Sequence, residues 1–114
     1  MFSGLFSKRL SGSDPSVIGC EELAASVQAR DRAVVDVREP NEYADGHVPS
    51  AINLPLSRFD PKQLPSGKPV VLICRSGARS AKALSLARTG GRKDVVHYPG
   101  GFMGWSRRGG AVAK

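Results

Sequence analysis

The segment of residues 70–91 constrains the fold more than any other part of the chain. It begins with an aliphatic run, Val70–Ile73, continues into the small and basic residues 74–80, and ends in a helical pattern that extends to about residue 88. An aliphatic run without polar alternation is typical of a strand buried on both faces of a sheet. We therefore predict a central parallel strand here, followed by a helix whose inward stripe comprises Ala81, Leu84, Leu86 and Ala87.

The remaining segments alternate between strands and helices in the same way. Strands are predicted at residues 16–18, 33–37, 51–54 and 94–98, and helices at residues 20–29, 41–45 and 102–107, with a brief helix within residues 56–63. This alternation predicts an α/β fold, in which a parallel sheet is covered by helices on both faces.

The length of 114 residues fits one domain, and 40% hydrophobic with 24% charged residues is ordinary for a folded chain. We expect a flexible tail over residues 1–14 and a domain over residues 15–114. The tail lacks the residue order of a secretory signal, and no run approaches the ~20 apolar residues of a membrane span. These features predict a cytoplasmic protein without a membrane partner, in which cysteines stay reduced.

Cysteine count and charge narrow the possible partners. The two cysteines, Cys20 and Cys74, are too few for a disulfide scaffold and have no metal-ligand spacing. The 17 Lys and Arg exceed the 10 Asp and Glu, and the net charge of +7 suits an anionic partner. The basic residues are scattered and are not interleaved with aromatic residues, so we predict a solvated basic surface and no nucleic-acid partner.

Residues 74–80 carry the predicted chemistry. Cys74 follows the central strand and precedes a helix N-terminus, where free amides and the helix dipole stabilise negative charge. We therefore predict a nucleophilic thiol with a lowered pKa. Gly77 permits a positive φ, and Ala78 keeps the approach open. A structural cysteine is the alternative, but the polar and cationic neighbours do not suit an apolar packing site. Cys20 is interpreted as a packing or inert thiol, and a redox role for it stays open.

Three segments carry a resemblance to a known family. They are residues 34–55 (VVDVREPNEYADGHVPSAINLP), 70–84 (VVLICRSGARSAKAL) and 98–112 (YPGGFMGWSRRGGAV). In this order and spacing the chain resembles the single-domain rhodaneses of the rhodanese-like sulfurtransferase superfamily. One departure is Ser50, where the family more often has glycine, and we expect it to matter little.

The resemblance implies a rhodanese-like fold, with a five-stranded parallel sheet, and a persulfide intermediate on Cys74. The sulfur donor would be a small anion such as thiosulfate. The acceptor would be cyanide or a thiol, including the thiol of an acceptor protein. The resemblance implies no metal or organic cofactor.

The resemblance also assigns roles within the loop. Arg75 is expected to contact the anionic donor, whereas Arg79 either braces the loop through a carboxylate or backbone carbonyls or supplies positive potential. The substrate-binding loop then comprises Arg75, Ser76, Gly77, Ala78, Arg79 and Ser80, with hydroxyl donors on the two serines.

Other matching positions have structural interpretations. Asp36 and Arg38 either border the pocket or form an ion pair or loop clamp, and Glu42 is a candidate partner of Arg38. His47 is interpreted as a hydrogen-bonded structural histidine, and Trp105 as a core anchor.

Two other function classes stay open. Phosphatases and arsenate reductases also place a cysteine and an arginine in an anion-binding loop, but they separate the two by five residues, whereas four lie between Cys74 and Arg79. The third class is a sulfur carrier or a binding module that does not turn over. An aryl-phosphate assay separates phosphatase activity from sulfur transfer. Salt-dependent transfer of sulfur to a protein acceptor would favour a sulfur carrier.

Overall fold

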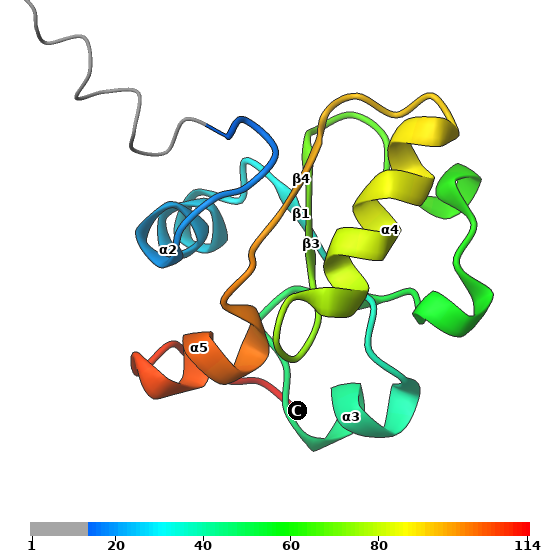
Figure 1. The fold of residues 1–114 in the computed structure, drawn as a ribbon. Coiled ribbons are helices and arrows are strands. Elements are labelled where there is room, and N and C mark those ends of the chain that lie inside the picture. Colours follow the sequence, from blue (N-terminus) through cyan, green and yellow to red (C-terminus); the bar gives the residue numbers. More distant parts are fainter. Residues whose placement is uncertain (1–13) are drawn as a thin grey trace, which may run out of the picture.

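A computed structural model describes residues 14–114 as a sheet between two layers of helices (Figure 1). The strands are β1 (Ala33–Asp36), β2 (Ile52–Asn53), β3 (Val70–Ile73) and β4 (Val95–His97). The helices are α2 (Cys20–Ala29), α3 (Pro40–Asp45), α4 (Ala78–Thr89) and α5 (Gly101–Arg107), with short 3-10 turns η1 (Leu56–Arg58) and η2 (Pro61–Gln63). The expected tail falls on residues that lie, Asp14 apart, outside this described part. None of the described helices is long and apolar enough to cross a bilayer.

The sheet confirms the predicted parallel architecture but not the strand count. Its order is β2-β1-β3-β4 with every pairing parallel, so β3 is an inner strand. The fifth strand expected at residues 16–18 is reduced, in the described chain, to one parallel bridge between Val17 and His97. Two backbone hydrogen bonds support it, from the Ile18 amide to the His97 carbonyl and from the His97 amide to the Ser16 carbonyl. Pairing stops there because the chain turns into α2 at Cys20.

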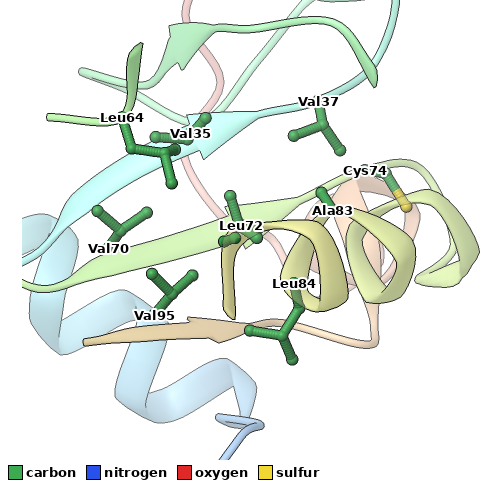
Figure 2. Packing of buried hydrophobic residues seen from close by; sticks show 10 residues of the cluster. Val35, Val37, Leu64, Val70, Leu72, Cys74, Ala83, Leu84 and Val95 are labelled. Atoms are coloured by element: carbon green, nitrogen blue, oxygen red, sulfur yellow. The ribbon is translucent and has the colours of Figure 1, made fainter. Parts of the chain in front are cut away.

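Two apolar clusters cover the two faces of the sheet. Because side chains alternate along a strand, Val70, Leu72 and Cys74 face α4, while Val71 and Ile73 face α2 and α5. Figure 2 shows the first cluster, with Cys74 at its edge beyond Leu72 and close to Ala83 of α4. The parity of β3 thus directs the Cys74 side chain to the side of the sheet on which α4 begins.

The inward stripe of α4 differs from the prediction. Ala81 and Leu86 are exposed, whereas Ser80, Ala83, Leu84 and Ala87 are buried. The buried positions follow the spacing i, i+3, i+4 and i+7 from Ser80, which is the normal pattern of a packed helix face. The prediction is therefore confirmed for Leu84 and Ala87 and wrong for Ala81 and Leu86, and it left Ser80 and Ala83 out of the inward stripe. Ser80 can be buried because its hydroxyl has partners inside the protein.

Candidate active site

The predicted loop lies at the carboxyl ends of the parallel strands. β3 ends at Ile73, Cys74 follows, and α4 begins at Ala78. Figure 1 shows that α3, α5 and the start of α4 gather at this end of the sheet. Carboxyl ends of parallel strands are where open α/β sheets bind their ligands, so the position of the loop suits a reactive site.

Gly77 shapes the loop and cannot readily be replaced. Its φ is 103°, in the region where side chains are strained, and a Cβ would overlap the carbonyl oxygen of Pro99. With this backbone conformation the Gly77 amide donates to the Sγ atom of Cys74 at 3.1 Å. The glycine thus turns the chain back so that its own N–H points at the sulfur.

The start of α5 holds the outer edge of the loop. The Phe102 amide donates to the Cys74 carbonyl at 2.7 Å, and the Met103 amide donates to the Arg75 carbonyl at 3.1 Å. Gly101 makes this approach possible, because its φ is 68° and a Cβ would overlap the Arg75 carbonyl group. Since these carbonyls bond outward, the loop's amides are left to face the sulfur.

The thiol of Cys74 is 1% exposed and is held by several donors. Burial raises the pKa of this thiol, but the Ser80 amide, the Ser80 hydroxyl and the amides of Gly77 and Ser76 outweigh it. The net pKa of Cys74 lies below the ordinary thiol value, in the direction expected from its place in the sequence.

Arg79 forms an ion pair with α3. Its Nη1 atom lies 2.6 Å from Glu42 Oε1, and its Nη2 atom lies 2.9 Å from Glu42 Oε2. The hydrogen bonds from Arg79 lower the pKa of Glu42 to about 2, against the opposing effect of burial. The same carboxylate accepts a bond from the Glu39 amide, so the pair ties the start of α4 to the N-terminus of α3.

Asp36 and Arg38 form a second, buried pair, so the expected Glu42–Arg38 pair is wrong. The Arg38 Nε and Nη2 atoms bond the Asp36 carboxylate, which is fully buried, and Nη2 also donates to the Gly46 carbonyl. The guanidinium lies 4.4 Å from the centre of the Phe102 ring. Asp36 is the last residue of a buried strand, so its charge needs a partner. Arg38 lies closer along the chain to Asp36 than to Glu42, and it pairs with Asp36.

A surface groove of 360 Å³ adjoins the loop. Its walls combine basic, acidic, apolar and hydroxyl side chains, namely Arg38, Arg75, Arg107, Glu42, Asp45, Phe102, Met103 and Ser106. Arg75 is exposed, and its Nη2 atom lies 3.8 Å from Met103 Sδ. Arg38 is buried and paired with Asp36, which lies outside these walls, so the exposed guanidinium groups that can meet an anion beside the loop are those of Arg75 and Arg107.

The two serines of the loop differ in position. Ser76 is exposed, whereas Ser80 is fully buried and its hydroxyl lies between Cys74 and His97. Sequence reasoning missed His97. The signal that could have found it is a polar residue at the same strand parity as the buried Val95.

The His47 side chain contacts Tyr43 of α3. Its Nδ1 atom is 2.8 Å from the Tyr43 carbonyl, and its ring stacks on the Tyr43 ring. Among residues 14–114, no group of three or more His, Cys, Asp or Glu side chains could hold a metal ion.

Comparisons with known proteins agree with this geometry. The family model described as the rhodanese-like domain matches residues 20–108. An uncharacterized protein of Synechocystis is 45% identical over 78 residues, which cover 67% of this chain but only 44% of that protein. A protein named sulfurtransferase from Allochromatium vinosum is 37% identical over 81 residues, covering 69% of this chain and 76% of its own length.

A solved structure also matches the fold. The crystal structure of a rhodanese-related protein from Thermoplasma volcanium superposes with a TM-score of 0.76 and 32% identity. The match covers 85% of this chain and 96% of that one.

Proposed function

The chain belongs to the rhodanese-like domain family, and we propose that it transfers sulfane sulfur through a persulfide on Cys74. One observation carries the proposal: backbone amides and a buried hydroxyl converge on this sulfur just ahead of α4. Donors placed in advance around a buried atom stabilise the negative charge that develops there during reaction.

In the first step, the Cys74 thiolate attacks the outer sulfur of a donor such as thiosulfate. A sulfur–sulfur bond forms to Cys74 while the bond between the outer sulfur and the sulfonate breaks, and its electron pair leaves with sulfite. The persulfide keeps one negative charge on its terminal sulfur. The loop amides can then stabilise the negative charge of the persulfide as they stabilise that of the thiolate.

In the second step, an acceptor attacks the terminal sulfur and Cys74 leaves as a thiolate. Cyanide would give thiocyanate, and a thiol would give a new persulfide. We propose that the acceptor in cells is a thiol of a small molecule or a partner protein, in the reducing cytoplasm. The groove beside the loop supports a binding role for Arg75, whose guanidinium is exposed where an anionic donor would arrive.

The position of Arg79 supports sulfur transfer over phosphate chemistry. A phosphatase of this kind needs its loop arginine to bind the phosphate oxygens. Here both terminal nitrogens of Arg79 bond the Glu42 carboxylate. We propose that Arg79 braces the loop rather than binds substrate.

The test is transfer of sulfur from thiosulfate to cyanide by the whole chain and by Cys74→Ser. Intact mass is measured after thiosulfate alone, and circular dichroism checks that the variant is folded. We expect thiocyanate from the wild type, a mass gain of one sulfur atom, and neither from the variant.

The other outcomes point to the alternatives. A mass gain without turnover would indicate a carrier whose acceptor is absent from the assay. No mass gain with thiosulfate or a polysulfide, together with turnover of an aryl phosphate, would overturn the proposal.

A further inference from the structure

Cys74, Ser80 and His97 form a buried chain of polar atoms. The Cys74 Sγ atom lies 3.6 Å from Ser80 Oγ, which lies 2.9 Å from His97 Nδ1. The three residues come from the end of β3, the first turn of α4 and the end of β4. They are 1%, 0% and 8% exposed, so water cannot readily replace any of these contacts.

The Ser80 hydroxyl has one proton and three acceptors within reach. These are His97 Nδ1, the Cys74 sulfur and the Gly77 carbonyl at 3.2 Å. When Nδ1 carries no proton, it accepts a hydrogen bond from the Ser80 hydroxyl, and the thiol S–H of Cys74 donates to Ser80 Oγ. When Nδ1 carries a proton, it donates to Ser80 Oγ, and the hydroxyl proton is free to point at the thiolate.

We propose that His97 is a positioning residue for Cys74, which through its Nδ1 proton turns the Ser80 hydroxyl toward the thiolate. This inference rests on the proposed function, because the thiolate is the form that attacks the donor. A hydroxyl that itself accepts a hydrogen bond is a stronger donor, so the chain favours the ionised cysteine cooperatively. Ionisation releases the Cys74 proton to solvent, and the His97 proton moves from Nε2 to Nδ1 by exchange with solvent.

The surroundings of His97 keep its ring neutral near pH 7. Burial lowers the pKa of His97, and the carboxylate of Asp14 opposes this in part. Arg88 of α4 interacts with the same carboxylate, and Cys74 is reached through Ser80. A neutral ring acts by its tautomer, so it can direct the hydroxyl without adding a charge to the sheet.

Without His97, the hydroxyl proton would be shared between the Gly77 carbonyl and the sulfur, and Ser80 Oγ would lose its donor. We expect His97→Phe to raise the pKa of the Cys74 thiol by about one-half to one unit. At a pH below the Cys74 pKa, the rate of persulfide formation would then fall about three- to tenfold, and it would recover at a pH above that pKa. His97→Asn, whose amide N–H₂ can donate to Ser80 from nearly the same place, should restore most of the loss.

The decisive measurement is the pH titration of thiolate ultraviolet absorbance in a Cys20→Ser chain, where Cys74 is the remaining thiol. It needs no sulfur donor, so its result is separate from failure of the proposed function. The variants are His97→Phe, His97→Asn and Ser80→Ala, with His47→Asn as the matched control because His47 bonds Tyr43 instead.

Two results would overturn the inference. One is an unchanged Cys74 pKa in both folded His97 variants. The other is an equal effect of His97→Phe with and without Ser80→Ala, since a residue acting through the hydroxyl must lose its effect when the hydroxyl is gone.

Discussion

Both cysteines of the chain lie at the start of a helix, yet their surroundings differ. Cys20 is the first residue of α2, which follows an extended Gly19 with φ −92° and has Glu21 and Glu22 in its first turn. Cys74 lies four residues ahead of α4, which follows a left-handed Gly77 and has no acidic residue in its first turn. Cys20 packs against the cluster on the α2 face of the sheet, whereas Cys74 receives hydrogen bonds from the loop.

The difference shows that a helix N-terminus does not by itself activate a thiol. The free amides of a helix point ahead of its first turn, so a side chain on the first residue does not receive them, whereas a residue before the helix can. That residue also needs a loop that turns back toward it. Gly77 provides this turn, and α5 binds the carbonyls that would otherwise compete for space around the sulfur.

Replacing Gly77 should remove most of the difference in thiol activation between Cys74 and Cys20. Gly77→Ala places a Cβ against the Pro99 carbonyl at a positive φ, and we expect a loss of about 2 to 4 kcal/mol in the free energy of unfolding. We expect sulfur transfer to fall about a hundredfold or more, because the amide is displaced from the sulfur. Urea unfolding and thiocyanate formation measure the two effects.

The matched control is Gly19→Ala, at the equivalent position of α2. This glycine has an ordinary φ, and nothing lies within 4 Å of a Cβ there. It should cost only a few tenths of a kcal/mol and leave transfer unchanged. Equal losses at the two glycines would contradict the role given to the Gly77 turn.

The Glu42–Arg79 pair should stabilise the α4 site in a pH-dependent way. The pKa of Glu42 in the folded chain, about 2, lies below its ordinary value of 4.5. Its stabilisation is therefore fully present above about pH 5 and is lost as the pH falls toward 2. We expect Glu42→Gln to lower the free energy of unfolding at pH 7 by about 1 to 2 kcal/mol, after allowing for the partial exposure of the pair.

Urea unfolding of both chains across this pH range tests the prediction, since the two curves should converge in acid. Asp94→Asn is the control, because Asp94 also pairs with an arginine, Arg92, but is half exposed. A difference for Glu42→Gln that persists unchanged to the lowest pH would exclude an ionic origin.

Binding of the anionic sulfur donor is a further expected difference between the Cys74 and Cys20 sites, and Arg75 tests it. Arg75 is exposed beside the groove, whereas the hollow beside Cys20 is lined by Glu21 and Glu22 as well as by Arg108. We expect Arg75→Gln to raise the KM for thiosulfate about fivefold with little change in kcat, through loss of about 1 kcal/mol of binding to the anion. Lys93→Gln removes the same charge at the opposite end of the sheet, before β4, and should leave the KM unchanged. A fall in kcat alone would argue against a role in donor binding.

The features that sequence could predict are local ones. The strand Val70–Ile73 and the turn at Gly77 follow from an unbroken aliphatic run and from a glycine ahead of a helix. The pairing of Arg79 with Glu42 joins residues 37 positions apart, and no local pattern distinguishes it from the expected Glu42–Arg38 pair. The prediction for α4 missed Ser80 as an inward residue for a related reason, because the histidine that its hydroxyl contacts lies on another strand.

Ser50 shows the same limit at a single residue. It was expected to matter little, but its φ is 66°, a conformation that glycine adopts without strain. A serine there costs about 1 kcal/mol relative to an extended or helical residue. Sequence shows the departure from glycine, whereas only the backbone shows what that departure costs.

The smallest expected effect is at Cys20. Cys20→Ser should leave the kcat and KM for thiosulfate within about twofold of wild type, because neither the loop nor the groove includes this residue. After thiosulfate treatment the variant should gain one sulfur atom in mass, as the wild type does, because the loop amides that stabilise a persulfide surround Cys74. Loss of turnover with the mass gain intact would instead make Cys20 a resolving thiol that accepts sulfur from Cys74. The two helix starts would then be partners in one reaction, and the contrast between them would describe a donor and an acceptor of sulfur instead of a reactive and an inert thiol.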